Sequence, residues 1–457
     1  MHKTDDKSEM SSCEQSEIDL NVNVNEVEVT DKSEWGTFKD SLKSPVHNWF
    51  TYPAGFSYKA VQHCIETYGL RAGTSVIYDP FMGSGTTNLT AKTMGINSVG
   101  VEAHPFVFRI AQCKMNWDIE SAKIVQFISD IDSDFKVVNE NDMIGELTRE
   151  FPELIMKCFL PSTLYELLHT RNRITSSSLD TEHKNFLITA LIGTLRVVSI
   201  AATGWPYIAP KKIKVTSLSR KGFGTYKNHV LQMLDDIAKI KRTSCSINSN
   251  HSLICGDSRD TSSCIDKESI DLIFTSPPYL NNFDYADRTR LEMYFTGEAK
   301  NWGDLSTKIR SKLMTSATTQ INRSDSKYVF HRGLIDECPD VYEFLANAVH
   351  ELSQKRLTKG GKKSYDLMVI GYFNDMYRIL KENYRVLKTG STASYVLGDS
   401  APYGVHIPTD IVIGNIGKYI GFSDYEIKVL RTRGGKWAAN PQRHSVMLRE
   451  TIVVLKK

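Results

Sequence analysis

One short run constrains the fold of this sequence more than any other: Asp79–Thr87, which reads DPFMGSGTT. It follows an apolar segment at 75–78, predicted as a strand, and precedes a predicted helix at 88–94. A second predicted strand at 98–101 ends at Glu102. Strand, glycine turn, helix and a strand ending in an acid form the opening unit of a doubly wound sheet. The sequence therefore predicts an α/β, Rossmann-like fold.

The glycine turn is also a candidate ligand site. Gly83 and Gly85 let the backbone turn tightly and approach a ligand closely. The helix that follows presents free N–H groups and a positive dipole end, which attract a carboxylate or phosphate. No G-K-[ST] follows, so the run is not a Walker A loop. Glu102 has the spacing of an acid that accepts ribose hydroxyls; the alternative interpretation is an ordinary turn and a solvated carboxylate.

Two further predicted strands, at 252–255 and 271–274, end in polar residues. Asp257 follows the first and could accept a hydrogen bond from an adenine amino group. The second ends in the run Thr275–Tyr279, which reads TSPPY. Two consecutive prolines stiffen the backbone and remove two N–H donors, so this loop can present carbonyl oxygens to an exocyclic amino group. Tyr279 offers a face for stacking a base; the alternatives are a packed tyrosine or a proline-type partner motif.

Together, DPFMGSGTT and TSPPY resemble the motifs of the amino-methylating DNA methyltransferases, which use S-adenosylmethionine. The serine variant of the second motif is typical of cytosine-N4 enzymes, whereas adenine-N6 enzymes usually have D-P-P-Y or N-P-P-Y. The resemblance extends to residues 47–57, 280–285, 396–400 and 407–409, and it covers 47–115 and 250–457. The order of the motifs, cofactor run first, departs from that of many S-P-P-Y enzymes, and so does the position of the intervening segment.

The resemblance implies roles for individual residues. Ser276, Pro277, Pro278 and Tyr279 are expected to form the catalytic loop. The expected cofactor contacts are Phe56, Ser57, Asp79, Pro80, Phe81, Gly83, Ser84, Gly85, Thr86, Glu102 and Asp257.

The implied reaction is direct, in-line attack of a base amino group on the cofactor's methyl group. The target base is expected to leave the duplex for this reaction, with Tyr279 stacked on it. Methylation of cytosine at C5 is disfavoured because it needs a cysteine nucleophile, usually in a P-C dipeptide, and the chain contains no P-C.

The leading hypothesis is a site-specific cytosine-N4 methyltransferase acting on duplex DNA as the modification enzyme of a restriction–modification system. A cognate endonuclease acting on the same site is a possible partner that need not be bound. The alternatives are adenine-N6 methylation, RNA guanine-N2 methylation, for which related loops usually carry an acid before P-P-Y, and a non-catalytic nucleic-acid-binding module.

The chain is predicted to divide into four parts. Residues 1–40 form an acidic tail, with an edge strand at 22–29 as the alternative, and residues 41–115 open the methyltransferase domain. Residues 116–250 form a mostly helical insertion, and residues 251–457 complete the domain, with a surface excursion at 297–340.

Charge is distributed unevenly over these parts. The tail carries 11 acidic and 4 basic side chains, a net charge of −7. Since the whole chain has a net charge of +3, the remaining residues have a net charge of +10. Residues 201–250 alone contribute +7, which suits an anionic partner, although a solvated helix face is an equal alternative. The candidate DNA contacts are Lys211, Lys212, Lys214, Arg220, Lys221, Arg431, Arg433 and Lys436, with Asn281, Asp284, Tyr285 and Arg288 beside the catalytic loop.

Cysteine and histidine spacing predicts no metal site, because the 8 cysteines form no C-x-x-C pair. The sequence shows no secretory signal, so we expect a cytoplasmic location and no disulfides. The most apolar stretch, 186–202, contains Arg196 and is predicted as a buried helix, not a membrane span.

Overall fold

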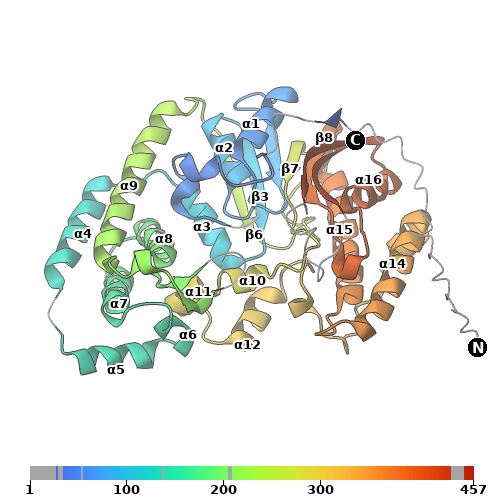
Figure 1. Cartoon of the computed structure of the whole chain (residues 1–457). Helices are drawn as coiled ribbons and strands as arrows, with labels where there is room; N and C mark the ends of the chain where they lie inside the picture. Colours follow the sequence, from blue (N-terminus) through green and yellow to red (C-terminus); the bar gives the residue numbers. More distant parts are fainter. Residues whose placement is uncertain (1–26, 29–33, 53–54, 136–137, 204–207, 434–446) are drawn as a thin grey trace, which may run out of the picture.

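The computed structural model describes residues 27–28, 34–52, 55–135, 138–203, 208–433 and 447–457. Its main element is an eight-stranded sheet with the order β1-β9-β10-β8-β7-β2-β3-β6 (Figure 1). The strands are β1 (Val27–Glu28), β2 (Val76–Asp79), β3 (Asn97–Glu102), β6 (His251–Cys255), β7 (Ile270–Thr275), β8 (Leu387–Gly398), β9 (Asp424–Arg433) and β10 (Leu448–Lys456). All neighbouring pairs are parallel except those of β10, which runs antiparallel to β8 and β9.

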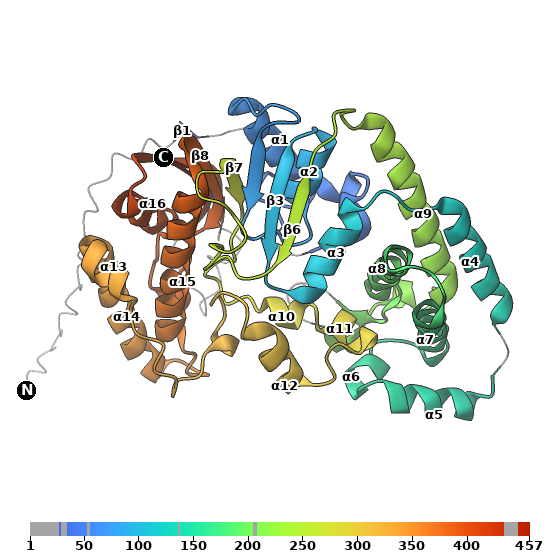
Figure 2. The ribbon, with the colours of Figure 1, turned by 180° about the vertical axis from the view of Figure 1, so that it is seen from behind.

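Helices cover both faces of this sheet, as a doubly wound fold requires (Figures 1 and 2). On one face, α1 (Tyr58–Thr67) and α2 (Thr86–Thr93) bury apolar side chains of β2, β7, β8 and β10. The other face is covered by α13 (Arg332–Glu337), α14 (Pro339–Thr358), α15 (Tyr365–Val386) and α16 (Thr409–Ile420). The predicted Rossmann-like α/β fold is therefore confirmed. Strand β9 and helix α14 were not predicted.

The mostly helical insertion is also confirmed. After α3 (Pro105–Met115), the chain forms α4 (Ser121–Asp134), α5 (Glu140–Glu150), α6 (Glu153–Met156), α7 (Pro161–Ser176), α8 (Thr181–Val198) and α9 (Gly222–Thr243), with a two-stranded ribbon, β4 (Ala201–Ala202) and β5 (Ala209–Ile213). These helices share one apolar cluster with α3 and with α11 (Arg290–Thr296), so the insertion packs against the sheet domain. The predicted buried helix coincides with α8, and no described helix has the length and apolar surface to cross a bilayer.

Two predicted segments differ from the structure. Residues 34–40 were assigned to the tail, yet Phe38 is 9% exposed and the Trp35 carbonyl accepts a hydrogen bond from Ser57 N at 2.9 Å. Residues 27–28 form β1 beside β9, within the alternative edge strand. The predicted surface excursion at 297–340 is partly buried, because Arg310 is 4% exposed and forms an ion pair with Asp284. Its polar composition reflects these internal contacts.

A buried ion pair joins the insertion to the sheet domain. Arg196 on α8 donates from Nε to Glu292 Oε1 on α11 at 2.5 Å, and from Nη2 to the Arg288 carbonyl at 2.6 Å. The Glu292 side chain is 0% exposed, and Arg196 is the closest cation that compensates its charge, with Arg288 Nη1 farther away at 3.9 Å.

We expect Arg196→Met to lower the free energy of unfolding by at most about 3–5 kcal/mol, because it removes the closest cation from the buried Glu292 carboxylate and leaves only Arg288 Nη1, at 3.9 Å. The double variant Arg196→Met/Glu292→Met should recover most of this loss. As a control, Arg173→Met removes the exposed pair with Asp134 and should cost at most about 1 kcal/mol. Chemical denaturation followed by circular dichroism measures these differences; equal stability of Arg196→Met and the control would contradict the role given to this pair.

Candidate active site

The main candidate site is a pocket at the carboxyl ends of β2, β3, β6 and β7, where doubly wound sheets bind their ligands. It contains about 870 Å³ of empty space up to and including its open mouth. Among its walls are eleven of the residues predicted from the sequence: Phe56, Pro80, Phe81, Gly83, Ser84, Thr86, Glu102, Asp257, Ser276, Pro278 and Tyr285. The glycine turn and the S-P-P-Y loop, nearly 200 residues apart in the chain, therefore share one cavity.

A buried carboxylate connects these two motifs. Asp79, which is 0% exposed, accepts hydrogen bonds from Phe81 N at 3.0 Å and from the hydroxyls of Thr87 at 2.7 Å and Thr275 at 2.6 Å. Burial raises the pKa of Asp79 to about 6, against the opposite effect of these hydrogen bonds. Asp79 was predicted to contact the cofactor, but it lies beneath the pocket and holds the turn, α2 and β7 together.

The turn places two glycines in a backbone conformation that other residues rarely adopt. Gly83 has φ +54° and Gly85 has φ +89°, both in the left-handed region that favours glycine. A Cβ on Gly85 would also approach the Ala111 Cβ to 3.3 Å, so Gly85 allows α2 to pack on α3. Gly83 contributes to the pocket wall, whereas Gly85, also predicted as a cofactor contact, does not.

Glu102 lies in the pocket at the end of β3. Its Oε2 accepts from Gly83 N at 2.9 Å and its Oε1 from His104 N at 2.7 Å. Burial raises the pKa of Glu102 to about 7, although both backbone donors favour the carboxylate. A carboxylate oxygen has more than one lone pair, so each can still accept a hydroxyl hydrogen. These acceptor oxygens fit the hydroxyls of the ribose of a nucleoside cofactor.

Asp257 enters the pocket from the end of β6. Its carboxylate accepts from Arg259 Nη2 at 2.7 Å, and Arg259 Nη1 donates to Asp375 on α15 at 2.9 Å. Burial alone would raise the pKa of Asp257, but the hydrogen bonds from Arg259 outweigh it and lower that pKa. The side chain is thus an ionised acceptor held at the pocket wall, as an adenine amino group requires.

The S-P-P-Y loop follows β7 directly. Ser276 and Pro278 face the pocket, Pro277 is buried, and the Ser276 hydroxyl donates to the Val396 carbonyl at 3.3 Å. Tyr279 is only 6% exposed, and its hydroxyl donates to Glu450 Oε1 on β10 at 3.0 Å. The loop is therefore fixed at both ends by the neighbouring strands β8 and β10.

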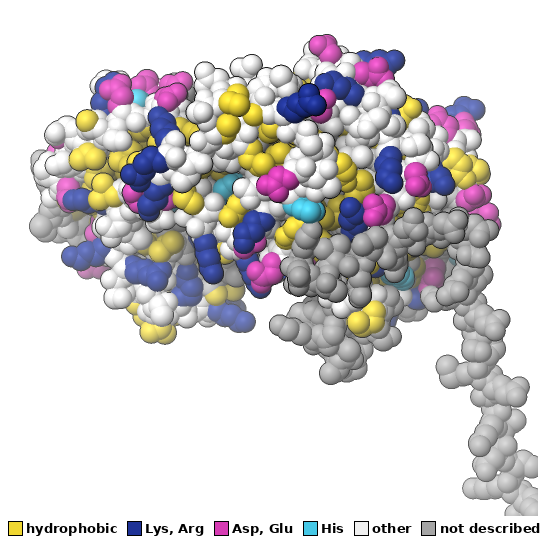
Figure 3. Space-filling model, turned by 90° about the horizontal axis from the view of Figure 1, so that it is seen from above, with side chains coloured by type: hydrophobic (Ala, Val, Ile, Leu, Met, Phe, Trp, Pro, Cys, Tyr) yellow, Lys and Arg dark blue, Asp and Glu magenta, His cyan; other side chains and the backbone are white. Residues whose placement is uncertain are grey.

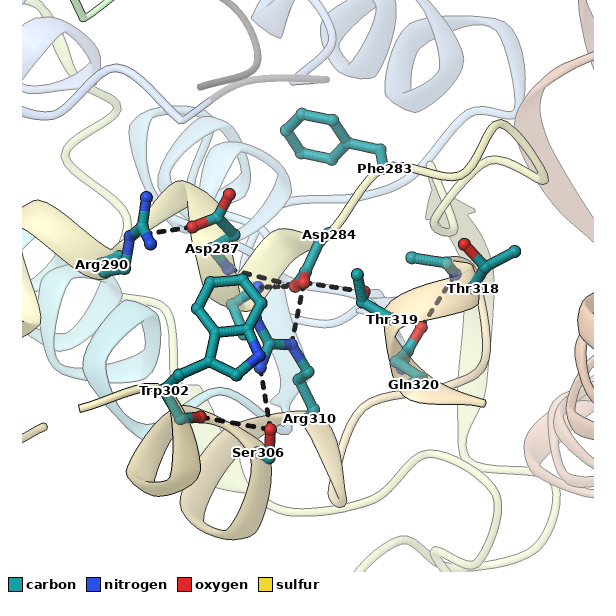
Figure 4. Close-up of polar contacts among 12 residues, drawn as sticks. Phe283, Asp284, Asp287, Arg290, Trp302, Ser306, Arg310, Thr318, Thr319 and Gln320 are labelled. Atoms are coloured by element: carbon teal, nitrogen blue, oxygen red, sulfur yellow. Dashed lines mark hydrogen bonds and ion pairs between the residues drawn. The ribbon is translucent and has the colours of Figure 1, made fainter. Parts of the chain in front are cut away.

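The residues after the loop have structural roles that the sequence did not reveal (Figure 4). Asp284 is 7% exposed, caps α10 (Tyr285–Arg288), and accepts from Arg310 Nε and the Thr319 hydroxyl, each at 2.8 Å. Arg288 is 8% exposed and donates to the Thr51 carbonyl at 3.4 Å. The prediction that Asp284 and Arg288 contact DNA is corrected, because both side chains are buried in protein contacts. Asn281 is exposed and stays a candidate, whereas Tyr285 lines the pocket.

The other basic residues predicted to contact DNA fall into two groups, those exposed to solvent and those bonded to other protein groups. Lys211, Lys212, Arg220 and Lys221 are exposed. Lys214 instead donates to the Arg196 carbonyl at 2.8 Å, Arg431 donates to Glu450 at 2.5 Å, and Arg433 donates to the Asp399 carbonyl at 3.0 Å. Lys436 lies outside the described residues.

Several pocket residues were not predicted from the sequence, and the predicted cofactor contact Ser57 lies outside the pocket. Tyr52, Lys312 and Met314 line the cavity. Tyr52 belongs to the upstream run 47–57 and could have been found from that motif, whereas Lys312 and Met314 lie in the supposed surface excursion and carry no sequence signal. Ser57, predicted as a cofactor contact, instead caps α1 and donates to Asp40 at 2.8 Å.

Comparison with known proteins agrees with this geometry. Residues 2–113 match a family model described as DNA methylase of the N6/N4 type. A type II methyltransferase of Geobacillus stearothermophilus, M.BsoBI, is 26% identical, with 92% of this chain and 87% of that protein covered.

More distant relatives cover most of the chain as well. M.AvaI of Nostoc is 24% identical over 92% of this chain and 88% of its own length. M.MvaI of Kocuria varians is 24% identical over 84% of this chain and 83% of its own length.

These matches confirm the resemblance that the motifs indicate: the chain is related to the amino-methylating DNA methyltransferases. It is a DNA methyltransferase whose methyl donor is S-adenosylmethionine, and the hydrogen-bond acceptors in the pocket, Glu102 and Asp257, fit that cofactor.

Glu102→Gln should weaken binding of S-adenosylhomocysteine about tenfold or more at pH 8, because the amide nitrogen must face one of two backbone N–H donors. As the pH falls from 8 to 6, Glu102 with its pKa of about 7 becomes protonated and loses acceptor capacity. The ratio of the affinity of the unmodified protein to that of Glu102→Gln should therefore fall toward one.

Isothermal titration calorimetry measures both effects, with the exposed Glu120→Gln as control. An affinity ratio that stays constant with pH would show that the ionised carboxylate of Glu102 does not hold the ligand.

Proposed function

We propose that this chain is a site-specific methyltransferase that modifies the exocyclic N4 of cytosine in duplex DNA. The observation that carries the proposal is the position of Ser276. A serine, in place of the acid or asparagine that is usual in adenine-N6 enzymes, heads the P-P-Y loop and lines the same cavity as Gly83 and Glu102.

The loop is built to accept hydrogen bonds. Ser276 donates its own hydrogen to the Val396 carbonyl, which leaves the lone pairs of its oxygen available. Pro277 and Pro278 have no N–H, so the backbone offers carbonyl acceptors and no donors at these two positions. An exocyclic amine could donate one hydrogen to each oxygen, which would localise its lone pair and orient the nitrogen. When bound, S-adenosylmethionine supplies the electrophilic methyl group, and positioning provides much of the rate.

A base inside a duplex cannot reach this pocket, so the proposal requires that the target nucleotide leaves the stack. Stacking of Tyr279 on the base would require that its ring, which is 6% exposed and absent from the pocket wall, becomes uncovered as the base enters. Its hydroxyl is bonded to Glu450, which also pairs with Arg431, and the Arg433 guanidinium lies 5.6 Å from its ring centroid. These interactions fix the plane of the ring before a base arrives.

Lys211 and Lys212 on β5 are the leading candidates for contact with the DNA backbone. Both are exposed, and neither has an ion-pair partner among the described residues. Ile213 and Val215 beside them are 61% and 74% exposed, which is typical of a surface that meets a macromolecule. The described part of the face in Figure 3 shows both basic and acidic side chains.

We further propose that the enzyme provides the modification half of a restriction–modification system. This rests on the relatives, which are type II methyltransferases. A cognate endonuclease would act on the same site without needing to bind this chain.

Incubation with labelled S-adenosylmethionine and duplex DNA, followed by nucleoside analysis, should yield N4-methylcytosine. Ser276→Ala should lower turnover roughly tenfold to a hundredfold, with affinity for S-adenosylhomocysteine within about twofold of the unmodified protein. Ser353→Ala, which also removes a hydroxyl that donates to a carbonyl but lies outside the pocket, is the matched control. Recovery of N6-methyladenine would contradict the cytosine assignment, and labelling of RNA alone would contradict the substrate class.

Lys211→Ala/Lys212→Ala should weaken DNA binding and reduce the slope of log affinity against log salt by about 2, since each lysine that neutralises a phosphate contributes about one unit. Lys359→Ala/Lys363→Ala, which removes two exposed lysines after α14, should leave the slope unchanged. Fluorescence anisotropy at several salt concentrations gives both values. An unchanged slope in Lys211→Ala/Lys212→Ala would show that these two lysines do not contact the DNA backbone.

A further inference from the structure

A buried lysine lies directly behind the glycine turn. Lys114 on α3 is 1% exposed, and its Nζ donates to the carbonyls of His47 at 3.0 Å and Phe50 at 3.3 Å and to Ser84 Oγ at 3.4 Å. All three acceptors are neutral. No carboxylate pairs with Lys114 among the described residues, so its ammonium group has no counter-ion there.

A buried ammonium group without a counter-ion is unfavourable. Burial lowers the pKa of Lys114 to about 7, and its titratable neighbours do not offset this. Burial also lowers the pKa of His47 to about 3 and raises that of Cys113 to about 12, so both are neutral near pH 7. The site would therefore be stabilised by an anion that arrives from outside.

Ser84 connects this charge to the cofactor pocket. Ser84 lines the cavity, and because its oxygen accepts from Lys114, its own hydrogen is free to donate into the cavity. The turn also precedes the N-terminus of α2, whose first N–H groups favour negative charge. Glu102 and Asp257 suit hydroxyl and amino groups, so the anion of the ligand has no favourable place beside them.

We propose that Lys114, acting through the Ser84 hydroxyl, is the counter-charge for the carboxylate of the cofactor's methionine portion, and that it selects ligands that carry this group. The inference rests on the assignment of S-adenosylmethionine as cofactor. Lys114 is a positioning residue, since Ser84 stands between it and the cavity. A role limited to tethering the segment at 47–50 to α3 would make no distinction between ligands.

The test compares S-adenosylmethionine with decarboxylated S-adenosylmethionine, which lacks only the carboxylate. Lys114→Met should weaken binding of the first about tenfold or more, and of the second by no more than about twofold. Ser84→Ala should show the same selective loss while leaving the lysine in place. Lys92→Met removes a half-buried lysine that donates to the Met115 carbonyl outside the pocket, and it should bind both ligands normally.

Isothermal titration calorimetry supplies the affinities, and circular dichroism verifies that each variant is folded. Equal loss for both ligands in Lys114→Met and Ser84→Ala would overturn the inference and leave Lys114 a tether. Unchanged affinity for both ligands would overturn it as well. If the unmodified protein bound neither ligand, the cofactor assignment itself would fail, and the inference with it.

Discussion

The buried carboxylate of Asp79 is the interaction on which the geometry of the active site depends. Three donors from three elements converge on it: Phe81 in the turn, Thr87 on α2 and Thr275 at the end of β7. The residue after Thr275 is Ser276, so one side chain sets the distance between the cofactor turn and the catalytic loop. The raised pKa of Asp79 reflects the cost of burying this charge, and its three hydrogen bonds offset that cost.

The features predicted correctly from the sequence are those that depend on local patterns. The glycine turn, the acid at the end of β3 and the S-P-P-Y loop each occupy a few consecutive residues, and the topology of a doubly wound sheet brings strand ends together. Eleven predicted residues consequently meet in one pocket. Phe56 and Tyr285 were found because they belong to motifs that extend beyond the core runs.

The features that were missed depend on interactions between residues distant in sequence. Asp284 looks like an exposed loop residue until Arg310, 26 positions later, is seen to bind it. Arg288 has the composition of a DNA contact, but the packing of α10 buries it. Lys312 and Met314 reach the pocket from a stretch whose polarity suggested a surface loop. Composition reports the average environment of a segment, and it gives no information on where an individual side chain points.

The ion pair between Arg196 and Glu292 has a consequence for how such enzymes could diversify. The insertion occupies a crossover between adjacent parallel strands, β3 and β6, so exchanging it between relatives would leave every motif of the sheet intact. Yet an exchanged segment without a cation at position 196 would leave the buried Glu292 carboxylate with Arg288 Nη1, at 3.9 Å, as its remaining cation. A new insertion that already carries this cation would therefore fit the sheet domain at a smaller cost in stability than one that lacks it.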